Sequence, residues 1–205
     1  MTRPGLLAAC CGTLFALLVS GFAYAQDLQS WFSNPEENAQ RTLSEGKQGV
    51  LFVETILSEQ GQLRDCYGME IGLARLNDGW KGHMPTRSMH PLLQPFNSIL
   101  GGVAGIFPGD YVINSIKCER MVYNGLQARF RIRAGEVVNI GAIRFDIRAR
   151  DGFFVRTTVA HRSTEPLSRD TVAYFKQAYP KTFSRAVNRP MSLVGPPDAE
   201  YKGGL

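Results

Sequence analysis

The sequence predicts a mainly β fold: an antiparallel β-sandwich with a short N-terminal helix and a C-terminal helix. Short apolar stretches, several of them alternating, recur between residues 50 and 159. Turn signals rich in glycine, asparagine and aspartate separate these stretches. Several short strands divided by turn signals are typical of a sandwich. The length of the chain suits one domain, and its composition is ordinary for a globular protein.

The N-terminus has the features of a secretory signal peptide. Arg3 supplies a short positive region, an uncharged apolar stretch runs from Leu6 to Phe22, and Ala23-Tyr24-Ala25 matches a cleavage site. Residues 1–25 are therefore predicted to be a signal peptide, and the protein is predicted to be exported to the periplasm or cell envelope. Lipidation at Cys10 or an uncleaved membrane anchor is the alternative.

Cleavage after Ala25 would remove two of the four cysteines. The remaining pair, Cys66 and Cys118, predicts one disulfide, because an even number of cysteines in an exported protein favours pairing. Closing a loop of that length could stabilise the fold by about 4 kcal/mol. A reactive thiol is the alternative.

The charge of the chain limits the kinds of partner. The formal net charge is +5, and loss of Arg3 with the signal peptide lowers it by one. This excess is too small to indicate nucleic acid. The predicted partner is another envelope protein or an anionic glycan or lipid headgroup, with association at a membrane surface also compatible. No cofactor is predicted.

The strands are predicted from alternation and from turns. One irregularity lies after residue 137, where Val138 and Ile140 differ in parity from Ile143, Phe145 and Ile147. A bulge at Gly141 would bring all five side chains to one face. The predicted turns lie at residues 58–62, 77–79, 123–126, 134–136 and 151–152. The predicted strands cover residues 50–57, 63–76, 111–119, 127–133, 137–149 and 153–159.

Helix signals lie on both sides of the strands. Asn34-Pro35-Glu36-Glu37 begins a predicted helix that ends near Gly46. Ser168 can cap a second helix over residues 169–179, which Pro180 ends or kinks. The chain is then rich in proline and glycine. The predicted organisation is an N-terminal helical segment (26–48), a β-sandwich with its C-terminal helix (49–189) and a flexible tail (190–205).

Two stretches, PGDYVINSI and RFRIRAGEVVNIGAIRFDI, carry a resemblance to a known group. Their pattern is similar to that of uncharacterised bacterial envelope proteins with a transthyretin-like, or prealbumin-like, β-sandwich. The resemblance covers roughly residues 105–160 and implies this fold. It departs from the usual pattern at Asn139, where the group has an aromatic residue. It transfers no catalytic residue, because the pattern contains only turn chemistry.

Arginines alternate with apolar residues in the stretch RFRIRAGEVVNIGAIRFDIRAR, residues 129–150. Because strand side chains alternate between faces, arginines of two neighbouring strands can share one face. Arginine suits bidentate capture of carboxylate or phosphate, which predicts a binding surface for an anion. The alternative is a solvated face paired with Glu136, Asp146 and Asp151. The predicted binding surface comprises Arg129, Arg131, Arg133, Arg144, Arg148 and Arg150.

Residues 91–109 carry no charge until Asp110 and have apolar residues at helical spacing. Because Gly101, Gly102 and Gly105 weaken a helix, a kinked helix or an apolar packed loop is predicted. This segment could be an interface with a partner or a membrane, or it could pack on the protein's own sheet. The predicted interface residues are Leu92, Phe96, Ile99, Leu100, Val103 and Ile106.

Two further groups of residues could carry chemistry. His83, Met84, Met89 and His90 could hold copper, although a polar loop is the alternative. His161 lies near Ser163 and Glu165 in the sequence, but the chain has no G-x-S-x-G, H-E-x-x-H or C-x-x-C motif. The sequence therefore predicts an exported, non-catalytic binding or assembly module of the cell envelope. A small periplasmic hydrolase and a copper-binding periplasmic protein are the alternatives.

Overall fold

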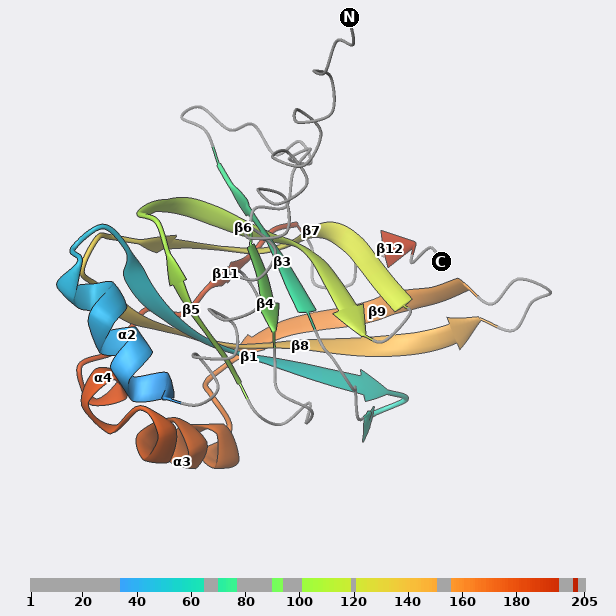
Figure 1. Cartoon of the computed structure of the whole chain (residues 1–205). Helices are drawn as coiled ribbons and strands as arrows, with labels where there is room; N and C mark the ends of the chain where they lie inside the picture. Colours follow the sequence, from blue (N-terminus) through green and yellow to red (C-terminus); the bar gives the residue numbers. More distant parts are fainter. Residues whose placement is uncertain are drawn as a thin grey trace, which may run out of the picture.

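In the part of the chain that the structure describes, two β-sheets pack together and three short helices lie on one side (Figure 1). The computed structural model describes residues 34–64, 70–76, 90–93, 101–118, 121–150, 156–195 and 201–202. This arrangement confirms the predicted mainly β, two-sheet fold with short helices towards both ends. The predicted signal peptide lies outside the described residues.

The larger sheet has seven strands and is mixed, whereas the sequence predicts antiparallel pairing throughout. β1 and β8 run parallel, with Leu51 beside Val138 and Leu57 beside Phe145. The turn before β8 is hydrogen-bonded to the start of β1, since the amides of Gly135 and Val50 donate to the carbonyl oxygens of Gln48 and Glu136 at 2.9 and 2.8 Å. Both strands therefore start at the same end of the sheet and run parallel. The strands are β1 (Gly49–Glu59), β2 (Gln62–Leu63), β5 (Gly102–Ile106), β8 (Val137–Arg150), β9 (Arg156–Glu165), β10 (Val187–Asn188) and β12 (Tyr201–Lys202).

The smaller sheet has five strands, and its described pairings are all antiparallel. Its spatial order is β11-β7-β6-β3-β4, so β11, which comes last along the chain in this sheet, forms one edge beside β7. The strands are β3 (Glu70–Arg75), β4 (His90–Leu93), β6 (Gly109–Cys118), β7 (Met121–Ile132) and β11 (Ser192–Leu193).

The main core lies between the two sheets, because alternate residues of each strand point inward. Leu51 and Val53 of β1 pack there with Ile143 and Phe145 of β8 and with residues of β6 and β7. The Gly141 bulge is confirmed. The β1–β8 register shifts at this point, and Val138, Ile140, Ile143 and Phe145 all join the same core.

A second core joins the helices to the outer face of the seven-stranded sheet. Phe52 of β1 makes edge-on ring contacts with Phe175, Tyr179 and Phe183, at centroid distances of 4.8, 5.4 and 5.0 Å. The predicted cap is confirmed, since Ser168 Oγ accepts a hydrogen bond from the Thr171 amide. The helices are α2 (Pro35–Ser44), α3 (Arg169–Ala178) and α4 (Pro180–Ser184).

Several predicted turns and segments differ in the structure. Asn124-Gly125 is not a hairpin turn: β7 runs through it, and the β6–β7 register shifts there, as at a bulge. Residues 134–136 do form a turn, but it connects β7 to a strand of the other sheet. Residues 102–106 form a strand that pairs with β1, not a helix or loop, because the paired backbone satisfies its hydrogen bonds despite the glycines.

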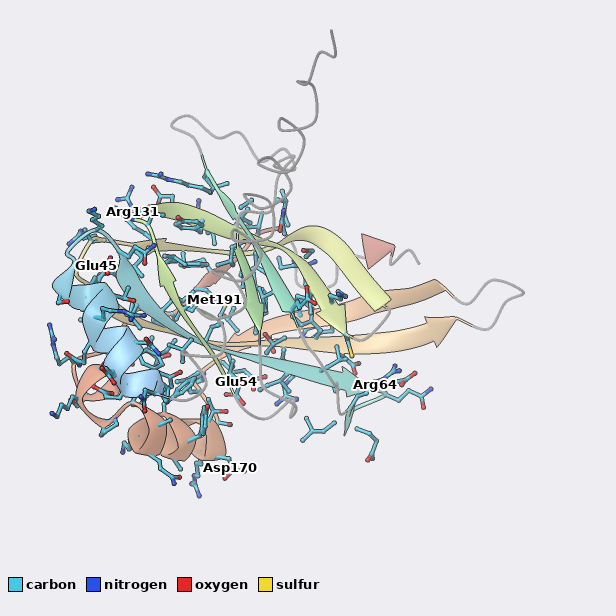
Figure 2. The ribbon with its side chains drawn as sticks, in the orientation of Figure 1. Glu45, Glu54, Arg64, Arg131, Asp170 and Met191 are labelled. Carbon is cyan, nitrogen blue, oxygen red and sulfur yellow. The ribbon has the colours of Figure 1, made fainter. Side chains whose placement is uncertain are left out.

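The C-terminal segment 187–194, called the strap below, is packed and not a free tail. It pairs with β8 at Val187–Asn188 and with β7 at Ser192–Leu193, so it connects the two sheets. Between these pairings Met191 is only 3% exposed and belongs to the main core, in the middle of Figure 2. The predicted flexible tail is therefore wrong for residues 190–194, because burial of Met191 and two strand pairings order them.

Candidate anion-binding site

The six predicted arginines do not share one sheet face. Arg129 and Arg131 belong to β7 in the five-stranded sheet, whereas the other strand arginines belong to β8 in the seven-stranded sheet. Because β7 and β8 are not neighbours, the two sets cannot form the predicted ladder. Arg148 and Arg150 pair in register with Thr158 and Arg156, and their side chains lie outside the described residues.

Arg129 and Arg131 point away from the main core, because Ala128, Phe130 and Ile132 fill it from the alternate positions. In Figure 2, Arg131 lies on the opposite side of the molecule from Asp170 of helix α3. An open pocket of about 290 Å³ lies beside these two arginines. It is lined by Leu76, Asp110, Tyr111, Arg129, Phe130, Arg131, Arg189, Pro190 and Ser192.

We call this cavity the arginine pocket. Its first charged element is an ion pair between a residue of β6 and a residue of β7. Asp110 and Arg131 face each other in the strand register. The carboxylate accepts Arg131 Nε at 2.8 Å and Nη2 at 2.6 Å, which is the bidentate geometry that arginine favours. The pair is open to water, with side-chain exposures of 60% for Arg131 and 46% for Asp110.

Arg129 is the second charged group. It is exposed two residues from Arg131, on the same face of β7. Within the described part of the chain, no hydrogen bond or ion pair engages its guanidinium. Ser192 of the strap lies directly opposite Arg129 in the β7–β11 register and also lines the pocket. The pocket thus holds a cation and a nearby hydroxyl donor.

Arg189 of the strap is the third charged group, and it is tied to Glu136. Its Nη1 donates to Glu136 Oε2 at 3.0 Å, and its Nη2 donates to Oε1. Glu136 Oε2 also accepts the Arg133 amide at 2.9 Å. Burial alone would raise the pKa of Glu136, but these hydrogen bonds and the charges of Arg189 and Arg133 outweigh it and lower the pKa. Glu136 therefore stays ionised and holds the strap against the turn.

Arg133 and Arg144 complete the set of predicted arginines that the structure describes. Arg133 is exposed in the turn after β7. Arg144 points outward from the other sheet, where its Nε and Nη2 bind Glu165 at 2.8 and 3.2 Å. Glu165 therefore binds Arg144 within its own sheet, and the Ser163 hydroxyl donates to the same carboxylate. Arg189 was not predicted to belong to the site. It lies at the boundary between the predicted β-sandwich and the predicted tail, where the sequence suggests no partner for it.

The apolar segment does not form one helical face. Leu92 belongs to β4, and Val103 and Ile106 belong to β5. Ile106 is fully buried in the main core, whereas Val103 packs with the helices. Phe96, Ile99 and Leu100 lie outside the described residues, so an interface formed by them stays a prediction.

The predicted copper ligands lie almost wholly outside the described residues. Only His90 has a described backbone, at the start of β4 opposite Leu73. Among the described side chains, no group of three or more histidines, cysteines or acidic residues is placed to hold a metal ion. None of the described helices is long and apolar enough to cross a membrane.

The cluster of His161, Ser163 and Glu165 lies on β9, not after the last strand as the sequence predicts. Ser163 Oγ donates to Glu165 Oε1 at 3.0 Å. His161 faces Asp146 across the strands, and Asp146 Oδ1 accepts the Ser58 hydroxyl at 3.1 Å. The Ser163 hydroxyl is thus directed at Glu165, whose carboxylate also binds Arg144.

Arg162 is fully buried between the sheets and was not predicted from the sequence. Its Nη1 donates to the carbonyl oxygens of Leu126 and Gln127 at 2.9 and 3.2 Å, and its Nη2 donates to the Val194 carbonyl at 3.1 Å. It therefore connects β9 to the bulge in β7 and to the end of the strap. Strand alternation alone would not have found it, because the β8–β9 register shifts between Asp146 and Ile147 and so changes which residues of β9 face inward.

Cys118 is buried at the end of β6 and is disulfide-bonded. Cys66 lies outside the described residues, so its pairing with Cys118 stays a prediction. No family model, curated protein or solved structure matches this chain. The mainly β, two-sheet architecture is shown, while the transthyretin-like relationship stays a prediction.

Proposed function

We propose that this protein is an exported, non-catalytic binding module of the cell envelope that holds an anionic group in the arginine pocket. Export rests on the predicted signal peptide and on an even pair of remaining cysteines. The binding role rests chiefly on Arg129, an exposed cation in a pocket that two further arginines line. Arginine is the side chain best suited to carboxylate, phosphate and sulfate groups.

The charges around the pocket favour an anion. Arg131 and Arg189 are each matched by one carboxylate, and Arg129 and Arg133 add positive charge without a matching ion pair in the described residues. This excess of positive charge would attract an anionic glycan or lipid headgroup. At an ionic strength of about 0.1 M, salt would screen the attraction at separations beyond about 10 Å. Binding of such a group in the arginine pocket would hold the protein at the envelope surface.

The proposal predicts salt-sensitive binding that depends on the pocket. The purified mature protein should bind a sulfated glycan or vesicles with anionic lipid at low ionic strength, measured across a salt series. Arg129→Gln should weaken binding about tenfold, which corresponds to ~1.4 kcal/mol. Arg64→Gln is the matched control, because Arg64 is an arginine paired with Glu59 at the far end of β1. Equal losses in both variants, or no binding at low salt, would contradict the proposed site.

A further inference from the structure

Resting on the proposed function, we infer that Asp110 is an internal counter-anion of the pocket. It occupies Arg131 when the pocket is empty. A dianionic tetrahedral oxyanion, a phosphate or sulfate group, takes its place by bridging Arg129 and Arg131. Asp110 would then oppose ligand binding, and a variant without its charge would bind the ligand more tightly.

Exposure decides which of the two ion pairs in the pocket can exchange. Asp110 and Arg131 are 46% and 60% exposed, and ion pairs as open as this contribute little to stability. Glu136 is only 13% exposed and also accepts the backbone amide of Arg133. An incoming anion therefore displaces Asp110 at low cost, while Glu136 keeps Arg189 in the wall of the pocket.

The number and spacing of the guanidinium groups favour a dianion. Once Asp110 leaves Arg131, Arg129 and Arg131 can both turn their guanidinium groups to one ligand on the same face of β7. Their Cα atoms are about 7 Å apart, two strand residues, so two long side chains can converge on one small ion. Each guanidinium can bind two oxygens of a phosphate or sulfate group. Ser192, opposite Arg129, adds a hydroxyl donor on the strap side. A monocarboxylate such as acetate would neutralise only one of the two cations.

The test compares Asp110→Asn with Glu70→Gln. Glu70 pairs with Lys117 across β3 and β6 of the same sheet, at side-chain exposures of 33% and 43%, so this control changes the net charge equally but not the pocket. Inorganic phosphate, sulfate and acetate are titrated at constant ionic strength in a zwitterionic buffer and followed by calorimetry. We expect Asp110→Asn to tighten phosphate and sulfate binding about fivefold or more, because it removes a competing charge. Glu70→Gln should change it less than twofold.

The outcomes separate this inference from the proposed function. If the wild type binds phosphate and Asp110→Asn binds it equally or more weakly, the counter-anion role is wrong while the anion pocket stands. An equal gain in Glu70→Gln would also overturn the role, since net charge alone would explain it. If neither the wild type nor Asp110→Asn binds any of the three anions, both proposals are wrong.

A measurement on the wild type covers the case in which Asp110→Asn does not fold. The Nε–H signals of the arginine side chains are followed by NMR while phosphate is added. Displacement of Asp110 predicts that the signals of Arg129 and Arg131 move together along one binding curve. The Arg144 signal, held by Glu165 on the other sheet, should stay in place. A shift of Arg129 without Arg131 would overturn the exchange.

Discussion

At Gly141 the backbone of β8 adopts a conformation that side chains disfavour. Its φ is +81°, in the left-handed region, and the Asn139 side chain accepts its amide at 2.9 Å. A Cβ atom at this position would lie 2.6 Å from the carbonyl oxygen of Glu165. The bulge therefore needs glycine for two separate reasons, the backbone angle and the close approach of β9.

Gly135 shows the effect of the backbone angle alone, because it shares the left-handed angle of Gly141 but not its close contact. Its φ is +69°, and a Cβ atom there would have no neighbour within 4 Å. Gly135→Ala should lower the free energy of unfolding by about 1 kcal/mol, the usual cost of a left-handed angle for alanine. Gly141→Ala should lower it by roughly 3 kcal/mol, because the backbone of β9 must also move. Urea denaturation measures both changes, and equal losses would show that the contact with Glu165 does not matter.

The strap is the element whose docking builds one wall of the pocket. Its amides at Met191 and Val194 donate to the carbonyl oxygens of Ile140 and Gln127 at 3.0 Å each. One acceptor lies in each sheet, so the strap must stay on both sheets to keep both hydrogen bonds.

Hydrogen exchange tests the docking of the strap. The amides of Met191 and Val194 should exchange at least a hundredfold more slowly than in an unstructured chain, because they are hydrogen-bonded within ordered structure. NMR or mass spectrometry on the whole protein measures this at neutral pH. Fast exchange at both positions, with slow exchange at Ile113 of β6, would show a strap that leaves the sheets and a pocket that lacks a stable wall.

The elements also show which parts of the fold the sequence determines locally. The bulge at Gly141 and the cap at Ser168 were predictable, because each depends on residues that are close in sequence. The pairing of β8 with β1 was not, since strand alternation reveals the face of a residue but not the sheet. For the same reason, Arg144 was wrongly predicted to lie on the same sheet face as Arg129. The pocket was not predicted, because Arg189 lies in the strap. The proline and glycine content of this part of the chain indicated a flexible tail and not a segment that packs beside β7.

At the scale of the whole molecule, two ion pairs make stability depend on pH. The hydrogen bond from Arg144 lowers the pKa of Glu165, assisted by Ser163 and opposed by burial. The pKa of Glu136 is lowered by Arg189 and Arg133 against its own burial. A carboxyl with a lowered folded pKa stabilises the protein above its unfolded value of about 4.3, and the contribution is lost as pH falls through the folded pKa.

The free energy of unfolding should therefore be steady from neutral pH to about pH 5 and then fall at lower pH. Urea denaturation at a series of pH values between 7 and 3 measures this profile. The double variant Glu136→Gln and Glu165→Gln should be less stable at pH 7 and should show a shallower fall in acid. A fall of the same steepness in the double variant would assign the acid sensitivity to other carboxyl groups.

The parallel pairing of β1 with β8 also sets the order in which the chain can fold. Ten of the eleven residues of β1 are buried, yet the partner of its central part lies about ninety residues further along the chain. During synthesis, β1 therefore emerges long before β8 can cover it. Such late pairing slows folding and leaves an apolar strand available for wrong contacts in the meantime. The feature that gives the mixed sheet its shape thus predicts a newly made chain that is prone to aggregation until β8 has been synthesised.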